Sequence, residues 1–143
     1  MRQIHIPLAT LALGLILSAN TCSDKGAGAD AARAMQGKWV LETVNGEAVH
    51  MPEGKEAPYL TVDSAAQNVS GFAGCNRVFG PIKVWGDSIS FEGLAATRMY
   101  CVETQQVEDA FMGALNGTRT FLVKGDKLTL LGGKELAVLR KGH

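Results

Sequence analysis

The sequence predicts a mainly β protein, a small antiparallel β-barrel or curled sheet of about eight strands with one packed α-helix. Short segments that alternate apolar and polar residues follow one another from residue 37 to residue 141, and a period of two is typical of half-buried strands. Tight-turn residues separate these segments, which favours antiparallel pairing. One segment has apolar residues at helical spacing. A sandwich with the helix packed on it is the alternative arrangement.

The clearest strand signal is GKWVLETVNGEAVH at residues 37–50. Trp39, Leu41 and Thr43 alternate there with the residues between them, as on one face of a strand. Asn45-Gly46 follows, and supplies the two residues with positive φ that a type I′ turn requires. The segment is therefore predicted to form a β-hairpin.

Further strand signals fill the middle of the chain. Residues 51–58 contain two prolines and a glycine and predict a loop, and YLTVD at 59–63 predicts a short strand. The glycines of VSGFAGCN at 69–76 indicate a bulge or a close approach of two backbones. Two alternating runs then flank the turn predicted at Gly86-Asp87.

The helix is predicted over TQQVEDAFMGALNG at residues 104–117. Its apolar residues recur at helical spacing, and they are Val107, Ala110, Phe111, Ala114 and Leu115. Thr104 is the expected N-cap, and Asn116-Gly117 ends the helix. Three strands joined at Gly125-Asp126 and Gly132-Gly133 are predicted to close the chain.

The beginning of the chain indicates export. Arg2 precedes an apolar run of twelve residues, Leu8 to Ala19, which is shorter than the roughly 20 residues of a membrane-spanning helix and has the length of a signal-peptide core. Residues 1–21 are predicted to be a signal peptide and 22–35 a flexible linker. Residues 36–141 form the one predicted domain, and the periplasm is the predicted location.

Cys22 is a candidate lipidation site. It lies just past the apolar run, three residues after Ala19, at the position where bacterial lipoproteins carry an acylated cysteine. Such sites usually have Leu three residues before the cysteine and Gly or Ala just before it, whereas this chain has Ala19 and Thr21. Ordinary cleavage at the small residues 27–29 is the alternative. Membrane association is expected only through this anchor.

The other two cysteines are predicted to form a structural disulfide. Export leads to an oxidising compartment, where neighbouring thiols tend to pair. Cys22 lies at the processing site, so the natural pair is Cys75 with Cys101. Neither residue belongs to a C-x-x-C motif, which makes a redox role less favoured.

Composition argues against several classes of function. Fourteen Lys and Arg balance fourteen Asp and Glu, and a neutral chain without a basic stripe argues against nucleic-acid binding. Cys75 and Cys101 stand alone, and none of the three histidines lies near either of them in a motif, so the four ligands typical of zinc sites are lacking. No nucleophile elbow, P-loop or dinucleotide fingerprint occurs. We therefore expect no cofactor, no metal and no enzymatic activity.

Several residues have a structural interpretation that outweighs a catalytic one. Glu103, Glu108 and Asp109 are expected on a solvated helix face rather than as a pair of catalytic carboxylates. Met99 and Met112 are expected to fill the core, the common use of methionine. Two aromatic residues on alternating segments are expected in the core or at its rim, and these are Trp85 and Phe91.

Three stretches in series carry a family resemblance: WVLETVNG at 39–46, SGFAGCNRVFG at 70–80 and LAATRMYC at 94–101. Together they resemble the META domain, the HslJ-like family of bacterial envelope proteins, over about residues 36 to 141. The residues that match the family pattern are Trp39, Leu41, Gly74, Cys75, Asn76, Phe79, Gly80, Thr97, Met99 and Cys101. Tyr100 departs from it, because Ala or Met is usual there.

The resemblance implies a lipocalin-like curled sheet with a helix, and an association with heat shock, stress response and novobiocin resistance. It implies no established activity or catalytic residue. We expect a monomeric binding or stabilising module whose partner in the envelope, a protein or a small molecule, is unknown. The alternatives are a binder of small apolar ligands in the barrel interior, or an inhibitor-type module that binds proteins through a surface patch.

The segment LAATRMYC is expected to cross from the last strand before the helix to the helix itself. Cys101 would fasten this crossing to the Gly74-Cys75-Asn76 turn. Three residues form the candidate recognition surface at this place, and they are Asn76, Arg98 and Tyr100. We weigh the structural role of the segment above its role in recognition.

Overall fold

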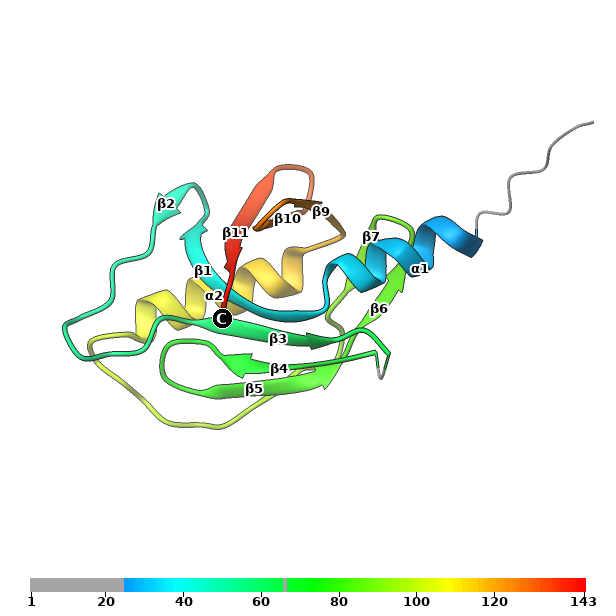
Figure 1. The fold of residues 1–143 in the computed structure, drawn as a ribbon. Helices are drawn as coiled ribbons and strands as arrows, with labels where there is room; N and C mark the ends of the chain where they lie inside the picture. Colours follow the sequence, from blue (N-terminus) through cyan, green and yellow to red (C-terminus); the bar gives the residue numbers. More distant parts are fainter. Residues whose placement is uncertain (1–24, 66) are drawn as a thin grey trace, which may run out of the picture.

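The computed structural model describes residues 25–65 and 67–143. One antiparallel sheet curls into a half-barrel, helix α2 (Gln105–Gly117) lies on its concave side, and helix α1 (Lys25–Ala34) lies at one end (Figure 1). The predicted fold class is confirmed. The sandwich alternative is wrong, because the described strands belong to a single sheet.

The sheet contains eleven strands in the described part of the chain. They are β1 Gly37–Val44, β2 Glu47–Ala48, β3 Tyr59–Asp63, β4 Asn68–Phe72, β5 Arg77–Pro81, β6 Lys83–Trp85, β7 Ser88–Ser90, β8 Ala95–Ala96, β9 Thr120–Lys124, β10 Lys127–Leu131 and β11 Glu135–Lys141. Their order is β6-β7-β9-β10-β11-β1-β3-β4-β5-β8, and β2 pairs with β1. The prediction of about eight strands was too low in part because β2 and β8 have two residues each, too few for a periodic pattern.

The sheet is curled because β5 leads directly into β6. These two strands lie near opposite ends of the sheet order, yet only Ile82 separates them in the chain. Consecutive Cα atoms are about 3.8 Å apart, so the two ends of the sheet must approach each other at Ile82. Its N–H donates to the carbonyl of Gln67 at 2.9 Å, and its side chain is buried.

The first hairpin forms as predicted, with one difference in register. Asn45 and Gly46 have φ values of 51° and 82°, and they connect β1 to β2 in the type I′ manner. A bulge shifts the pairing of β1 with β11 between Leu41 and Thr43. The extra residue reverses the alternation beyond it, so Val44 is buried instead of Thr43.

The predicted helix corresponds to α2, which packs against β1, β10 and β11. Phe111, Ala114 and Leu115 are buried, as helical spacing indicates. Thr104 precedes the helix, but its side chain makes no capping hydrogen bond. The helix therefore owes its place to the apolar stripe that it buries.

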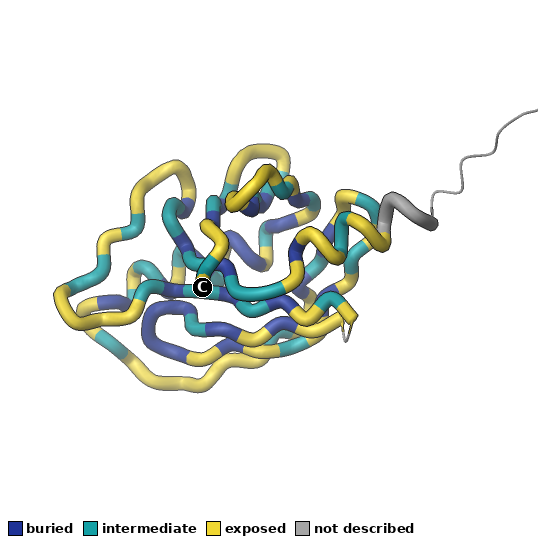
Figure 2. Tube along the Cα trace, in the orientation of Figure 1, coloured by how far each residue is buried: buried dark blue, intermediate teal, exposed yellow. Residues whose placement is uncertain are grey.

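The core lies between the concave face of the sheet and α2, where buried segments of both meet (Figure 2). Its largest fully buried side chains are Trp39, Phe111, Met35, Leu60, Ile82, Leu115, Leu128, Leu130, Leu139, Val62, Val69 and Val78. These side chains fill the interior of the half-barrel, the place where ligand-binding β-barrels have a cavity.

The predicted flexible linker, residues 22–35, is wrong for its described part. Residues 25–34 form α1, and five of these ten residues are alanine, the strongest helix former. The helix contacts β6, and Ala31 packs against the core. Met35 is fully buried, and its carbonyl accepts the indole N–H of Trp39 at 2.7 Å. The folded domain therefore includes α1.

The predicted signal peptide, residues 1–21, and Cys22 lie outside the described residues. Neither helix in the described ranges has the length and apolar character needed to cross a membrane.

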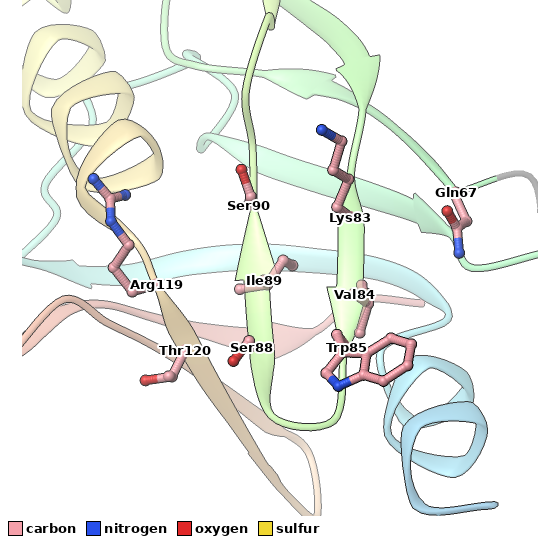
Figure 3. A pocket seen from close by; sticks show the side chains of 9 residues that line it. All are labelled: Gln67, Lys83, Val84, Trp85, Ser88, Ile89, Ser90, Arg119 and Thr120. Atoms are coloured by element: carbon pink, nitrogen blue, oxygen red, sulfur yellow. The ribbon is translucent and has the colours of Figure 1, made fainter. Parts of the chain in front are cut away.

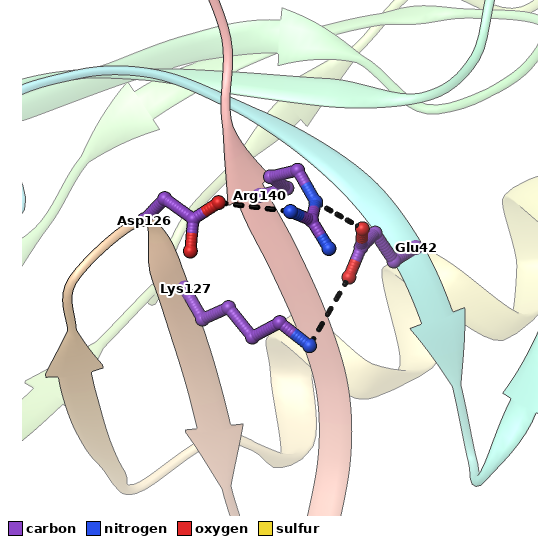
Figure 4. A network of polar contacts seen from close by, with 4 residues as sticks. All are labelled: Glu42, Asp126, Lys127 and Arg140. Carbon is purple, nitrogen blue, oxygen red and sulfur yellow. Dashed lines mark hydrogen bonds and ion pairs between the residues drawn. The ribbon is translucent and has the colours of Figure 1, made fainter.

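An exposed network of charges joins three strands on the outside of the sheet (Figure 4). Glu42 on β1 accepts a hydrogen bond from Arg140 on β11 and lies 3.8 Å from the ammonium of Lys127 on β10. Arg140 also bonds to Asp126 at 2.9 Å. The hydrogen bond and charge of Glu42, and the charge of Asp126, raise the pKa of Arg140. Solvent screens such exposed pairs, so their contribution to stability is small.

Candidate functional site

Three segments far apart in the sequence meet at one end of the half-barrel. They are the turn Ala73–Asn76 between β4 and β5, the first turn of α2, and residues 97–103, which enter α2. In Figure 1 the last of these belongs to the yellow-green segment that passes below β5. A disulfide joins Cys101 to Cys75, and residues 97–103 are called the bridged loop below.

The turn is built around Gly74. The N–H of Ala73 donates to the carbonyl of Asn76 at 2.9 Å, and Gly74 has a φ of 124°, which residues with a side chain rarely adopt. A Cβ atom at Gly74 would lie 3.6 Å from the carbonyl oxygen of Thr104 and 3.6 Å from the amide nitrogen of Glu108. The turn therefore packs directly on the beginning of α2.

Glu108 is the one buried carboxylate among the described residues, with 7 % of its surface exposed. One oxygen, Oε2, accepts the main-chain N–H groups of Cys75 at 2.9 Å and Asn76 at 2.5 Å. The other, Oε1, accepts the side-chain amide of Asn76 at 2.6 Å. These bonds, and the positive end of the helix dipole, offset the cost of burying a charge.

The prediction that Glu108 lies on a solvated helix face is therefore wrong. Glu103 and Asp109 are exposed, as expected. Glu108 instead joins α2 to the β4–β5 turn through three hydrogen bonds. The physical reason is its place on the buried side of the helix, next to the N–H groups of Cys75 and Asn76, which donate to its carboxylate.

Asn76 is also buried, with 3 % exposed, so its predicted place on a recognition surface is wrong. Its Oδ1 accepts the N–H of Met99 at 2.7 Å and the hydroxyl of Thr97 at 2.9 Å. Its Nδ2 donates to the carbonyl of Met99 at 2.9 Å and to Glu108. Two acceptor and two donor positions exhaust the capacity of an amide. Asn76 therefore fixes the bridged loop from its buried side, through hydrogen bonds to Thr97 and Met99.

The predicted disulfide between Cys75 and Cys101 is present. The two Cα atoms are 5.7 Å apart, and 26 positions separate the residues in the chain. The carbonyl of Cys101 accepts the N–H groups of Thr104 and Gln105 at 3.1 and 2.8 Å. The bond thus ties the β4–β5 turn to the entry of α2.

The bridged loop exposes a run of apolar side chains. Met99, Tyr100 and Val102 are 61 %, 76 % and 81 % exposed, and Figure 2 shows most of this segment as exposed. The expected burial of Met99 is wrong, because its main chain, and not its side chain, is bonded to Asn76. Arg98 and Tyr100 are at the surface, as the candidate recognition surface requires.

A separate pocket lies at the other edge of the sheet, between β6, β7 and β9, with a volume of about 610 Å³ (Figure 3). It is lined by Gln67, Lys83, Val84, Trp85, Ser88, Ile89, Ser90, Arg119 and Thr120. Trp85 is 82 % exposed, which places it at the rim, and Phe91 is buried in the core. Both locations agree with the sequence prediction.

The two cations of this rim pocket have intramolecular partners. Lys83 lies 3.7 Å from Glu92. Arg119 donates to the carbonyls of Asn116 and Thr118 at 2.9 and 2.8 Å, which satisfies groups at the end of α2. Most of the surface that lines the pocket is apolar, although six of its nine lining residues have polar or charged side chains. Within residues 25–65 and 67–143, no three His, Cys, Asp or Glu side chains are grouped as metal ligands.

The family model of the META domain matches residues 32–143. The chain belongs to the META domain family. The match begins inside α1 and includes Met35, which is buried in the core. Two of the three META-domain motifs, residues 70–80 and 94–101, thus have a common physical basis, because Cys75 and Asn76 hold Thr97, Met99 and Cys101.

Two solved structures share the fold of this META domain. One, an NMR structure of a protein from Burkholderia xenovorans, has a TM-score of 0.63 and 23 % identity, and the match covers 96 % of this chain and 99 % of that one. Another NMR structure has a TM-score of 0.61 and 24 % identity, with 77 % and 92 % covered. At these identities the likeness concerns the fold alone. No curated protein matches the chain.

Proposed function

We propose that this META-domain protein is a non-enzymatic module of the bacterial envelope that binds a partner protein through the bridged loop. One observation carries the proposal. Met99, Tyr100 and Val102 are exposed to solvent, although the loop that bears them is fixed by a disulfide and by hydrogen bonds to Asn76 and Arg77.

A fixed loop with exposed apolar side chains suits protein recognition. Binding usually requires side chains and loops to be ordered, at a cost of about 0.5–1.5 kcal/mol for each flexible side chain. Here the backbone of residues 97–101 is ordered before any partner arrives, because Asn76 and Cys75 hold it. Tyrosine and methionine are enriched in protein interfaces. Tyr100 is thus the expected anchor.

The non-enzymatic part of the proposal is supported by the use of Glu108. Its carboxylate accepts three hydrogen bonds from Cys75 and Asn76, which is the use expected of a structural acceptor rather than of a catalytic base. The expected stress-response role belongs to the same proposal, since an envelope module that binds proteins can protect or inhibit them.

Export and anchoring remain part of the proposal. The disulfide between Cys75 and Cys101 suits an oxidising compartment such as the periplasm. Acylation of Cys22 would hold the domain at the membrane, and the equal numbers of cationic and anionic residues do not favour binding to nucleic acid. We expect a monomer.

A small apolar ligand in the rim pocket is a second candidate function. The pocket volume of about 610 Å³ and the exposed indole of Trp85 favour it, because ligand pockets are typically a few hundred Å³ and largely apolar. The barrel interior does not suit such a ligand, because Trp39, Phe111 and Leu115 fill it.

A photo-crosslinking amino acid placed at position 100, with position 85 as the matched control, tests the proposal. Both sites carry an exposed aromatic side chain, one on the bridged loop and one at the rim pocket. Irradiation of cells that export the protein should give a discrete protein adduct at position 100. Equal adducts at both positions, or none at position 100, would contradict it. A small-molecule adduct at position 85 alone supports the second candidate.

A further inference from the structure

We infer that the partner binds as an extended strand added to the free edge of the sheet at β8, through a segment that carries acidic and apolar side chains. This inference rests on the proposed function and specifies how the partner is bound.

β8 has one side on which its main-chain N–H and carbonyl groups can pair with an added strand. β8 ends the sheet order and pairs with β5 on one side, Val78 with Ala96 and Phe79 with Ala95. No described strand lies on its other side. Strand addition to an exposed sheet edge of this kind is a common mode of peptide recognition.

The hydrogen-bonding register continues beyond the two residues of β8. The N–H of Thr97 donates to the carbonyl of Arg77 at 3.1 Å. The N–H and carbonyl of Met99 are both bonded to the side-chain amide of Asn76. The side-chain amide of Asn76 thus takes the place of a main-chain peptide group opposite Met99. Through it, the inward side of the segment stays hydrogen-bonded from β8 as far as Met99.

Alternate residues of a strand direct their main-chain groups to opposite sides. Thr97 and Met99 face the protein, so Ala96 and Arg98 direct their N–H and carbonyl groups outward. No described residue bonds to these outward groups, and both residues are exposed. They offer two donors and two acceptors to an incoming strand.

No described strand covers the outer side of this edge, and Arg98 is the charged residue beside it. Proteins commonly cover or charge their sheet edges, and at the opposite end of the sheet α1 contacts β6. At β8 the side chains of Ala95 and Ala96 are small and leave room for a second backbone. Phe79 and Met99, 52 % and 61 % exposed, supply apolar surface beside it.

The charges at the edge specify the partner. Arg77 and Arg98 are exposed, and neither has an ion pair with a described residue. An incoming strand with Asp or Glu opposite Arg98 would gain a favourable cross-strand pair, whereas Arg77 lies one strand further in, on β5, and adds positive charge nearby. A second copy of this chain would place Arg98 against arginines of the same edge, where like charges disfavour pairing. The occupant is therefore a segment of another protein.

The probe is a capped octapeptide of alternating valine and glutamate, and its control has lysine in place of glutamate. Both are titrated into the isotope-labelled exported protein, and amide resonances are followed by NMR. We expect the glutamate peptide to shift the amides of Ala96 and Arg98 and to slow their hydrogen exchange. We expect the lysine peptide to do neither. Absence of these effects with the glutamate peptide overturns strand addition.

Ala96→Pro removes the outward N–H and leaves the inward bonds of Thr97 and Met99 intact, since proline is tolerated at a strand edge when its nitrogen faces solvent. We expect it to weaken peptide binding at least about tenfold, whereas Ala96→Val, which keeps the N–H, should change binding by less than about twofold. Equal binding by both variants overturns the inference. Melting curves of the two variants establish that each is folded.

The two proposals fail in different ways. If position 100 crosslinks to a partner and Ala96→Pro leaves that adduct unchanged, the proposed function stands and strand addition is overturned. If the peptide binds at Ala96 and Arg98 but position 100 gives no adduct, the proposed function fails. A dimer in sedimentation experiments, with the same amides protected, overturns the assignment to a different protein.

Discussion

Asn76 continues the hydrogen bonding of β5 with its side chain. Arg77, the first residue of β5, receives the N–H of Thr97 at its carbonyl and donates its own N–H to the hydroxyl of Thr97. The amide of Asn76 then takes both main-chain groups of Met99. Because one end of this amide also contacts Glu108, the positions of the loop, the turn and α2 are coupled through a single side chain.

Because of this coupling, we expect Glu108→Gln to lower the free energy of unfolding, although glutamine has nearly the same size and shape as glutamate. Oε2 faces two N–H groups and Oε1 faces the Nδ2 of Asn76, so either orientation of the new amide sets a donor against a donor. Asn76 cannot rotate to relieve the conflict without reversing its bonds to Met99. We expect a loss of about 1–3 kcal/mol in the free energy of unfolding, measured by chemical denaturation.

Glu103→Gln is the matched control for this measurement. Glu103 is exposed and forms an ion pair at 3.5 Å with Lys55, and exposed pairs contribute about 0–1 kcal/mol. Equal effects of the two substitutions would show that the buried carboxylate has no special role.

The sequence contained part of this information about Glu108. Glu108 precedes Phe111 by three residues and Leu115 by seven, so it lies on the same stripe of the helix as the apolar residues. What the pattern could not provide is the source of its partners. They come from Cys75 and Asn76, more than thirty positions away, and only the packing of the turn on α2 brings them to the carboxylate.

At the scale of secondary structure, α1 changes where the domain begins. The Ala- and Gly-rich composition of residues 22–35 indicated a linker, but Met35 is fully buried and its carbonyl holds the indole of Trp39. A short helix with a weak apolar stripe gains stability from such tertiary packing more than from its own propensity. Composition alone could not distinguish a docked helix from a tether.

Met35→Ala should therefore destabilise the domain. Removing a fully buried methionine side chain typically costs about 2–5 kcal/mol, because the cavity collapses only in part. Thermal unfolding followed by circular dichroism measures this loss. Arg33→Ala on the same helix is the control, since Arg33 is exposed and pairs only with exposed Asp30. A melting temperature equal to that of the control would mean that α1 and Met35 do not dock on the core.

Long strands were predicted well, and short or irregular elements were not. β3 and β11 carry clear alternation over five and seven residues. β8 has only Ala95 and Ala96, which show no period, and its pairing with β5 depends on contacts across the chain. The bulge between Leu41 and Thr43 likewise follows from the pairing with β11 and leaves no local signal.

At the scale of the whole molecule, two closures shape the half-barrel. Ile82 joins the opposite ends of the sheet order, and the disulfide joins the β4–β5 turn to the segment that enters α2. The first connection is the polypeptide chain between β5 and β6 and cannot be removed. The second is the disulfide, which a reductant can break, so its contribution can be measured.

Reduction of the disulfide should lower the free energy of unfolding by about 3–4 kcal/mol. The reason is that the unfolded chain gains conformational entropy when a loop of this length is no longer closed. The estimate uses the separation of 26 positions between Cys75 and Cys101. Domains of this size have about 5–15 kcal/mol in all, so the reduced protein should still fold, with the bridged loop held by Asn76 alone. Denaturant titrations with and without reductant measure the difference.

The Cys75→Ala/Cys101→Ala variant separates this effect from that of the reductant itself, because its unfolding midpoint should not respond to reductant. In the wild-type chain the fold holds the two Cα atoms 5.7 Å apart, within the usual range of disulfides. Because the folded domain keeps the two sulfur atoms together, we expect the disulfide to persist in glutathione buffers of cytosolic potential. Rapid, reversible reduction there would instead assign a redox role to the pair, and an unchanged midpoint on full reduction would remove its structural role.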